Sequence, residues 1–276
     1  MEVLRDVETI ASPKMKGRKT GTKGNERARD YITKRLEKEN LNYRIHEFNI
    51  GKSEVSGQNI IVEIAANSKP RIVLTAHYDH IGRVGKNTYL GADDNASGVG
   101  AGLYIASVLN GRTSLEYPVW IVFTDAEELG LAGSKALVED FQLNESNTLI
   151  NINLDMIGRS KHNEIYACGA NIHRQFKEVL EETYNTGSYS MKIKYGHDLT
   201  PNRHDFKVSR LESWLYQSDH ANFFVRGIPF IYFGVERHED YHGVGDTYEK
   251  INTTFFLSVC DFIYAFMQKI QSSDML

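Results

Sequence analysis

The sequence predicts an α/β protein, a three-layer sandwich in which a mostly parallel, mixed central sheet lies between two layers of helices. Two observations support this fold class. Short apolar runs with little alternation recur along the chain, as expected of strands that are covered on both faces. Segments with helical spacing lie between these runs, and strands that alternate with helices favour a parallel sheet. No repeat or linker interrupts the 276 residues, so we expect a single domain over residues 1–276.

The expected elements can be taken in chain order. The first helix covers residues 25–41, where Ala28, Ile32 and Leu36 recur at helical spacing opposite a charged face. Strands are expected at the apolar runs 59–64, 71–76, 118–124, 147–156 and 228–234. Further helices are expected at 96–110, 172–184 and 253–270. In such sheets functional groups collect beyond the carboxyl ends of the strands, so the residues that follow each run deserve most scrutiny.

Composition excludes several classes of function. The net charge of −4 gives no basic field, so we expect no nucleic-acid partner. No run of eighteen apolar residues is present, so we expect no membrane association through a spanning helix. The opening residues lack the apolar segment of a signal peptide, which leaves localisation open: exported if this is a mature form, cytoplasmic otherwise. Cys168 and Cys260 fit no ligand spacing and are interpreted as small buried hydrophobes or a single bridge.

Histidine and acidic residues follow the expected strands one after another. They are His77 and Asp79 in "HYDH", Asp93 and Asp94 in "GADDNASG", Asp125, Glu127 and Glu128 in "DAEELGLAGS", Asp155 in "NLDMIG", and His242 in "YHGVGDT". A cluster of carboxylates repels itself unless it binds a cation, and imidazole with carboxylate but no thiolate suits a catalytic zinc. More ligands are offered than one catalytic zinc takes, which predicts two ions. Asp79, two residues after His77, is expected to orient that imidazole.

In order and approximate spacing, these motifs resemble those of the di-zinc aminopeptidases of metallopeptidase family twenty-eight. The resemblance covers roughly residues 70 to 250, and the opening segment "IASPKMKGRKTGTKGNERARDYI" is also similar to that family. It implies the zinc-exopeptidase, phosphorylase/hydrolase-like form of the fold. It also implies the metal ligands: one zinc is held by His77 and Asp155, the other by Glu128 and His242, with Asp93 bridging them. The Asp93–Asp94 peptide is expected to be cis.

The same resemblance implies the reaction. The expected activity is removal of N-terminal residues from peptide substrates with a free N-terminus. Glu127 is expected to be the general base, taking a proton from the attacking water and passing it to the leaving amine. Asp79 is the second expected catalytic residue, acting through His77. Two adjacent glutamates, Glu127 and Glu128, therefore have two different expected roles.

Three alternatives are considered. The first is a glutaminyl-peptide cyclotransferase, which uses one zinc on the same fold. "GADDNASG" and "DAEELGLAGS" resemble the peptidases more, and the ligand set is complete for two metals. The second is a carboxypeptidase or dipeptidase, for which no basic pocket for a substrate carboxylate is apparent in the sequence. The third is a non-catalytic binding module, which typically loses ligands or the base, whereas this chain retains them.

Several residues near these motifs have open roles. Ser218, Asp219 and His220 are expected either to shape the floor of the site or to cap a helix, with Asp219 as the N-cap. Histidines without a motif match are expected on the surface: His80, His197, His204 and His238. Arg18 is expected in a solvated turn. The preferred N-terminal residue, the oligomeric state and the metal bound in the cell do not follow from the sequence.

Overall fold

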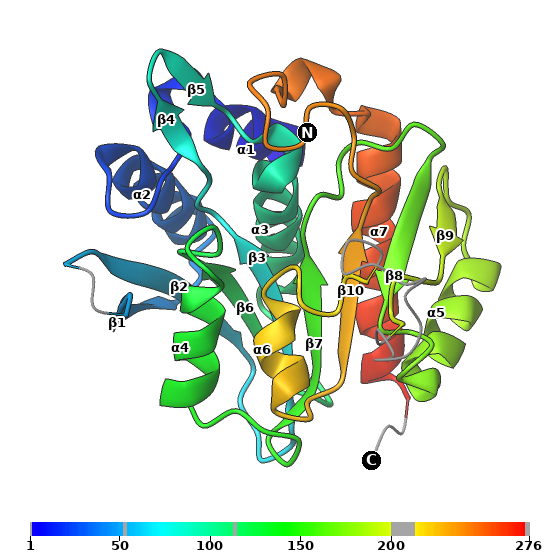
Figure 1. Ribbon diagram of the computed structural model, residues 1–276. Coiled ribbons are helices and arrows are strands. Elements are labelled where there is room, and N and C mark those ends of the chain that lie inside the picture. The colour runs from blue at the N-terminus through cyan, green and yellow to red at the C-terminus, as the bar shows by residue number, and fades with distance from the viewer. Residues whose placement is uncertain (1, 52–53, 113–114, 200–212, 274–276) are drawn as a thin grey trace, which may run out of the picture.

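The apolar runs form one eight-stranded sheet with the order β1-β2-β6-β3-β7-β10-β8-β9 (Figure 1). The computed structural model describes residues 2–51, 54–112, 115–199 and 213–273. The strands of the sheet are β1 (Tyr43–Asn49), β2 (Ser56–Ile64), β3 (Arg71–His77), β6 (Val119–Thr124), β7 (Thr148–Leu154), β8 (Glu164–Cys168), β9 (Lys192–Lys194) and β10 (Phe230–Gly234). A separate ribbon pairs β4 (Gly82–Val84) with β5 (Asn87–Tyr89).

The centre of the sheet is parallel. Strand β3 pairs in parallel with β6 on one side and β7 on the other, and β10 continues the parallel set beyond β7. Strands β2 and β8 run antiparallel to this centre, which makes the sheet mixed. The register places His77 opposite Thr124, the last residues of β3 and β6. The carboxyl ends of four neighbouring strands therefore meet at one edge of the sheet.

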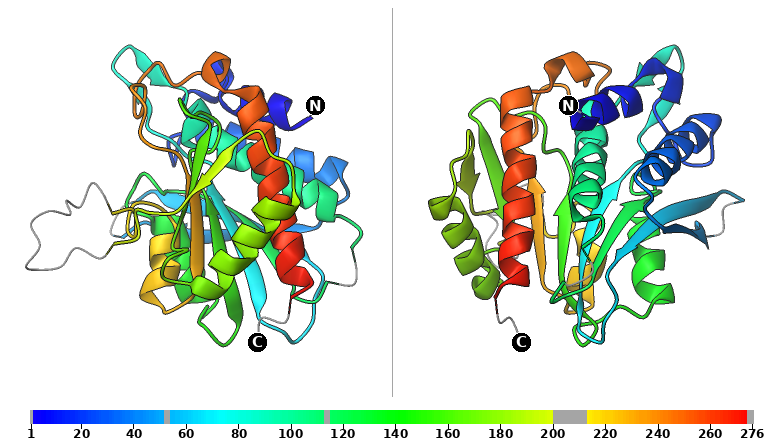
Figure 2. Two further views of the ribbon diagram at one scale, coloured as in Figure 1. Left: turned by 90° about the vertical axis from the view of Figure 1, so that its right-hand side faces the viewer. Right: turned by 180° about the vertical axis from the view of Figure 1, so that it is seen from behind.

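Helices cover both faces of the sheet (Figure 2). On one face lie α4 (Ala132–Asp140) and α6 (His220–Val225), which pack on each other and on the strands. The opposite face is covered by α2 (Lys23–Lys38), α3 (Gly98–Leu109), α5 (Arg174–Thr186) and α7 (Thr253–Gln271), and α1 (Glu2–Ile10) packs on α3. Single turns occur at η1 (Pro13–Met15), η2 (Ala92–Ser97) and η3 (Tyr248–Lys250). All five expected strands and all four expected helices are present within a few residues of their expected bounds.

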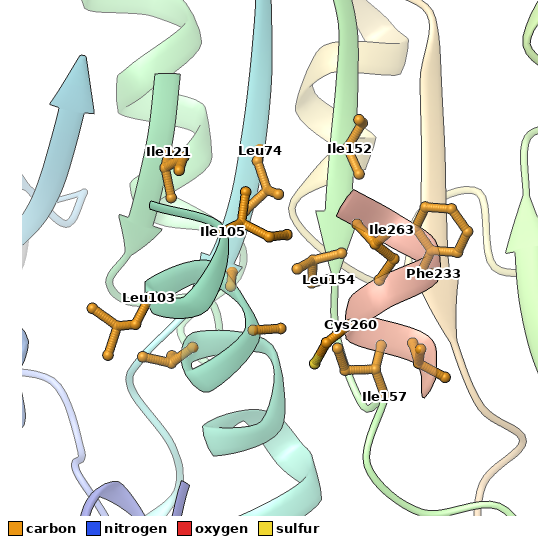
Figure 3. Packing of buried hydrophobic residues seen from close by; sticks show 14 of the residues in the cluster. Leu74, Leu103, Ile105, Ile121, Ile152, Leu154, Ile157, Phe233, Cys260 and Ile263 are labelled. Atoms are coloured by element: carbon orange, nitrogen blue, oxygen red, sulfur yellow. The ribbon is translucent and has the colours of Figure 1, made fainter. Parts of the chain in front are cut away.

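The larger hydrophobic core lies between the sheet and the face that carries α3 and α7. Leu74, Ile121 and Ile152 project from neighbouring strands toward Ile105 of α3 and Ile263 of α7 (Figure 3). Close approach of α3 to the sheet requires its small residues. A Cβ atom on Gly102 would lie only 2.8 Å from the Phe123 ring, so the run "GVGAG" is a packing feature.

The structure separates the two cysteines. Cys168 and Cys260 are both buried and free, so they do not form a bridge. They pack as small hydrophobic side chains in two different clusters.

None of the helices in the described ranges combines the length and the apolar character that a membrane crossing requires.

Candidate metal centre

The parallel strand ends bring the predicted residues together. His77 is the last residue of β3, and Asp155 directly follows β7. Glu127 and Glu128 follow β6 after a two-residue turn, and His242 lies in the loop after β10. Segments far apart in sequence thus meet because their strands are neighbours in the sheet.

The first donor group consists of His77, Asp94 and Asp155, all buried. The His77 Nε2 atom lies 3.3 Å from Asp155 Oδ1 and 3.4 Å from Asp94 Oδ1. His77 and Asp155 come from two strand ends and Asp94 from η2, and the three donors converge on one point. Such a set of one imidazole and two carboxylates suits a catalytic divalent cation.

The second donor group consists of His80, Asp94 and Glu128, so Asp94 belongs to both. His80 Nδ1 lies 2.8 Å from Glu128 Oε1 and 3.8 Å from Asp94 Oδ1. His242 approaches the same carboxylates, with Nε2 3.1 Å from Asp94 Oδ2 and 3.7 Å from Glu128 Oε2. A carboxylate between two donor groups is the arrangement expected of a bridged two-ion centre.

Asp94, and not the Asp93 expected as the bridge, is the aspartate that belongs to both donor groups. The Asp93 carboxylate turns away from the donor groups, accepting a hydrogen bond from the Gly158 N–H at 2.6 Å and lying 3.1 Å from His238 Nε2. The expected cis peptide is also displaced by one residue, because it joins Asp94 to Asn95. Neighbouring side chains in this loop point to opposite sides, so only one of the two aspartates can lie between the groups.

The loop of Asp93 and Asp94 is held from outside by two polar side chains. Asp246 accepts hydrogen bonds from the backbone N–H of Asp93 and of Asp94, at 3.0 Å each. Asn95 accepts from the Gly98 N–H and donates to the Leu154 carbonyl, which ties the loop to α3 and to the end of β7. Sequence reasoning missed Asp246, although it stands in the same "YHGVGDT" motif as His242.

Asp79 positions the two glutamates as well as the imidazole. Its carboxylate accepts from the Glu127 N–H at 3.0 Å and from the Glu128 N–H at 3.3 Å. His77 Nδ1 lies 3.2 Å from the Asp79 carbonyl oxygen and 3.7 Å from its carboxylate. The contact that orients His77 is therefore mainly with the Asp79 backbone, while the side chain fixes the loop of Glu127 and Glu128.

Asp125 anchors the same loop to the opening segment. Its carboxylate accepts hydrogen bonds from Thr20 Oγ1, Asn25 Nδ2 and the Tyr78 hydroxyl, at 2.9 to 3.0 Å. It also accepts from the Gln58 N–H at 3.0 Å. With the Ala126 N–H at 2.9 Å, five donors satisfy this buried carboxylate, which explains why its charge is tolerated inside the protein.

Arg18 is not in a solvated turn, contrary to the expectation, but completely buried. Its guanidinium donates to the carbonyl oxygens of Ile10, Tyr78, Leu90 and Gly91. Burial lowers the pKa of Arg18 to about 10, although nearby carboxylates, Asp94 first among them, favour the charged form. The opening segment thus places a cation beside the carboxylate cluster. A buried Arg was not expected, because "KGRKTG" has the composition of a turn.

The pKa values show that negative charge is concentrated at this edge. Burial raises the pKa of Glu127 well above its ordinary value, and the Asp155 carboxylate raises it further. Burial alone would lower the pKa of His77, but Asp155 and Glu127 hold it well above the usual range. Side chains that favour proton uptake in this way also favour a bound cation at the same place.

Buried polar atoms without a hydrogen-bond partner also indicate that a cation binds at this edge of the sheet. Within the described part of the chain, both ring nitrogens of His80 and Oε1 of Glu128 are buried without a hydrogen-bond partner. Buried polar atoms are normally paired, so these nitrogen and oxygen atoms are free to bind a metal ion. The donors are imidazole and carboxylate without thiolate, and they fit a divalent ion such as zinc.

Below the donor groups, polar side chains from α6 and its preceding turn form a floor. Asp219 occupies the N-cap position of α6, as one of the two expectations has it, but its side chain makes no capping hydrogen bond. Its Oδ2 instead accepts from Thr124 Oγ1 at 2.5 Å, and Ser218 Oγ accepts from Asn153 Nδ2 at 2.8 Å. Thr124 ends β6 and Asn153 lies in β7, so this floor is joined directly to the central strands.

The expected surface histidines have different environments. His80 and His238 are not free surface residues, since His80 is buried in the second donor group and His238 contacts Asp93. His197 stacks on Trp214, with ring centroids 4.0 Å apart. His204 lies outside the described residues.

A cavity of about 280 Å³ opens onto the donor groups. Its walls include Asp94, Glu127, Glu128, Asp155, Met156, Trp214, Gln217, Tyr232, Val235, Arg237, Tyr241 and His242. Carboxylates line the side next to the donor groups, and aromatic and aliphatic side chains together with Gln217 and Arg237 line the rest. A small molecule or a chain end with a cationic head and an apolar body is suited to this division.

Comparison with known proteins gives a family match. The model of Peptidase family M28 matches residues 59–267. Aminopeptidase YwaD of Bacillus subtilis (strain 168) is 40% identical over 117 residues, which cover 40% of this chain and 24% of that protein. The chain spans less than half the length of the curated relatives it matches.

Solved structures share the fold. Porphyromonas gingivalis glutaminyl cyclase superposes with a TM-score of 0.77 at 20% identity, covering 97% of each chain. A leucine aminopeptidase precursor from Bacteroides thetaiotaomicron gives a TM-score of 0.73 at 19% identity, covering 95% of this chain and 94% of that one. At such identities the likeness concerns the fold alone. The expected α/β sandwich with a mostly parallel mixed sheet is confirmed.

Proposed function

Because the chain belongs to peptidase family M28, we propose that it is a zinc-dependent aminopeptidase that cleaves the first peptide bond of substrates with a free N-terminus. The observation that carries this proposal is the position of Asp94, which is common to two groups of metal-donor atoms. A shared carboxylate suits two divalent ions roughly 3.5–4 Å apart. The similarity to aminopeptidase YwaD supports the same activity.

The residues that would hold the two ions follow from the donor groups. His77 and Asp155 would bind the first ion, Glu128 and His242 the second, and Asp94 would bridge them. When bound, zinc lowers the pKa of a coordinated water and polarises a carbonyl group.

Glu127 is the residue proposed to move the proton. It lies beside His77 and Asp155 at the wall of the cavity, and the hydrogen bond from its N–H to Asp79 fixes its backbone. Its carboxylate takes a proton from the attacking water while the water oxygen bonds to the scissile carbonyl carbon. As the carbon–nitrogen bond breaks, the same proton passes to the leaving amine. After the two proton transfers, the Glu127 side chain is again an unprotonated carboxylate.

The cavity explains why a chain end is selected. A protonated or free α-amino group is attracted by the carboxylates on one side of the cavity, which include Glu127, Glu128 and Asp155. The first side chain would lie against Trp214 and Tyr241, which predicts a preference for apolar first residues. An acetylated N-terminus removes the charge that these carboxylates attract.

The alternative is glutaminyl cyclisation with a single zinc. The fold of the Porphyromonas gingivalis enzyme is compatible with it, because that fold is shared over nearly the whole chain. The two donor groups favour hydrolysis, since a one-ion reaction leaves half of the donors without a role. The count of ions therefore distinguishes the two reactions.

The experiment combines metal content with a substrate panel. Zinc per chain is measured by mass spectrometry after reconstitution, and release of p-nitroaniline is measured with aminoacyl p-nitroanilides of apolar, acidic and basic residues. We expect close to two zinc ions, chelator-sensitive release that is fastest for apolar residues, and no release from N-acetyl-leucyl p-nitroanilide. One zinc ion, no release, and cyclisation of an N-terminal glutamine peptide would instead identify the cyclase.

A further inference from the structure

His80 lies inside the candidate metal centre although none of the expected ligand positions includes it. Its side chain is completely buried, and neither ring nitrogen has a hydrogen-bond partner among the described residues. Nδ1 faces the carboxylates of Glu128 and Asp94, at 2.8 and 3.8 Å. The shorter contact is not aligned as a hydrogen bond, so Glu128 Oε1 also remains unsatisfied. An imidazole buried against two carboxylates without a hydrogen bond requires an explanation.

We propose that His80 is an additional protein ligand of the second metal ion. The second subsite then offers two imidazoles, His80 and His242, together with the carboxylates of Glu128 and Asp94. This inference rests on the two-ion centre of the proposed function. It extends that centre by one ligand and assigns a role to the last residue of "HYDH".

The distances among the donor atoms are those of ligands around a common ion. Two atoms bound about 2.0–2.2 Å from one tetrahedral zinc ion lie roughly 3.3–3.6 Å apart. The His80 and His242 contacts with the shared carboxylates, from 2.8 to 3.8 Å, span this range. The two rings are 6.1 Å apart between centroids and inclined by 66°. Two imidazoles on one tetrahedral zinc have centroids roughly 5 Å apart, so the exposed His242 ring has to approach His80 by about 1 Å for both rings to bind the same ion.

The backbone around His80 holds the ring in this position. A Cβ atom on Gly91 would lie 2.6 Å from His80 Cδ2, so the ring fits there only because residue 91 is glycine. The His80 N–H also points at the Arg18 carbonyl, with a nitrogen–oxygen distance of 3.4 Å. A ring fixed in advance loses little conformational entropy when it binds a metal. A subsite with two nitrogens also favours zinc or cobalt over magnesium or calcium.

The test measures metal binding and does not use activity. Chelator-treated protein is titrated with Zn²⁺ and, separately, with Co²⁺, for the wild type, His80→Asn and His80→Gln. The asparagine amide places a donor where Nδ1 stands, so it can hydrogen-bond to Glu128 but is a poor zinc ligand. The matched control is His46→Gln, since His46 Nε2 also faces a carboxylate, Asp140 at 2.9 Å, in a place remote from the donor groups. X-ray absorption of the zinc-loaded wild type counts the imidazoles around the ions.

We expect both His80 variants to raise the dissociation constant of one ion by more than about 100-fold, beyond the usual effect of a residue that only supports a ligand. The other ion and the His46→Gln control should bind as in the wild type, and the Co²⁺ absorption bands of the weakened subsite should change. X-ray absorption should give three imidazoles over two ions. Wild-type affinity and spectrum in His80→Asn, only two imidazoles, or a wild type that binds a single ion would overturn the proposal. A protein without aminopeptidase activity would still give a clear answer here, because only bound metal is measured.

Discussion

Glu127 and Glu128 are neighbours in the chain, yet their carboxylates have different surroundings. Glu128 lies in the second donor group with His80 and Asp94, whereas the electrostatic neighbours of Glu127, beside the cavity, are His77 and Asp155. Their backbone N–H groups share one acceptor, the Asp79 carboxylate. A single hydrogen-bonded turn thus carries both the proposed proton acceptor, Glu127, and the proposed metal ligand, Glu128.

Glu127→Gln is expected to lower kcat by about 10²–10⁴-fold, because the amide cannot accept the proton of the attacking water. Bound zinc should stay at the wild-type level, since Glu127 is in neither donor group. Glu128→Gln is the matched control, and it should lose metal as well as activity. Near-normal turnover in Glu127→Gln, measured with the best p-nitroanilide substrate, would remove Glu127 from the base role.

Asp93 and Asp94 give a second pair of matched variants. Asp94→Asn removes a carboxylate from both donor groups and is expected to weaken the binding of both zinc ions. Asp93→Asn changes a side chain that contacts Gly158 and His238, so we expect zinc stoichiometry to be retained. Zinc titration of the two proteins checks this, and loss of metal in Asp93→Asn alone would restore Asp93 as the bridge.

His220 makes stability depend on pH independently of the donor groups. Burial lowers the pKa of His220 from 6.5 to about 3, so the ring stays neutral in the folded protein at pH values where the unfolded chain binds a proton. Its contribution to stability is complete above pH 6.5 and is lost as the pH falls from 6.5 toward 3. At pH 5 this loss amounts to about 2 kcal/mol.

His220→Gln removes this titration. Between pH 7.5 and pH 5, the free energy of unfolding should therefore fall by about 2 kcal/mol less in His220→Gln than in the wild type. Urea unfolding at the two pH values checks the difference. If the two proteins showed the same pH dependence, the His220 ring would take up a proton in the folded protein as readily as in the unfolded chain.

At the scale of elements, the start of α4 is pressed against the loop that carries the glutamates. A Cβ atom on Gly133 would lie 2.1 Å from the Asp125 carbonyl oxygen and 2.6 Å from Asn59 Oδ1. Neither atom can move freely, since Asp125 is anchored by several hydrogen bonds and Asn59 Oδ1 accepts from the Asp125 N–H. Small size at residue 133 therefore allows the helix to approach the site.

Gly133→Ala is expected to lower the free energy of unfolding by roughly 1–3 kcal/mol, the usual effect of overpacking. Gly196→Ala is the control, because no atom of the described residues lies within 4 Å of a Cβ atom there, and it should change stability by less than about 0.5 kcal/mol. Urea unfolding measures both. If the two variants were equally stable, α4 would be able to shift without lowering the free energy of unfolding.

The helices and strands differ in how well the pattern of apolar and polar residues in the sequence predicted them. The buried central strands are continuous apolar runs, so β3, β6, β7 and β10 were predicted from composition alone. β1 has the alternating, half-exposed sequence of an edge strand, and β9 has three residues, which gives too little pattern to recognise. α6 has six residues and is stabilised by packing on β10 and β7, a tertiary effect that local propensity does not contain.

The sequence predicted only part of the candidate site, because some of its features also depend on tertiary contacts. His77, Glu128, Asp155 and His242 follow strand ends and were placed near one another by topology, as the structure finds. The choice between Asp93 and Asp94 depends on the backbone conformation of one loop, which sequence spacing does not specify. His80 and Arg18 were missed because their burial depends on segments distant in sequence. Family membership confirms the resemblance drawn from the motifs.

For the whole molecule, metal binding should contribute to stability. The donor residues extend from His77 to His242 and lie on loops after several strands, so an ion bound by them stabilises only the assembled sheet. At a free zinc concentration 100 times the dissociation constant, each ion adds about 2.7 kcal/mol to the free energy of unfolding. Thermal unfolding with and without zinc checks this, with the Asp94→Asn protein as control. An unchanged melting temperature at saturating zinc would contradict binding at this edge.

Arg18 has a consequence for where a working fragment can begin. A fragment starting at β2 would keep the parallel strands and every candidate metal ligand, yet it would lack this guanidinium. The carbonyls of Leu90 and Gly91, just before the Asp93–Asp94 loop, would lose their donor, and the carboxylate edge would lose a permanent cation. Asp125 would lose Thr20 and Asn25 as donors at the same time. We therefore expect the minimal functional unit of this protein to include residues 18–25, although none of the candidate metal-donor residues lies in that segment.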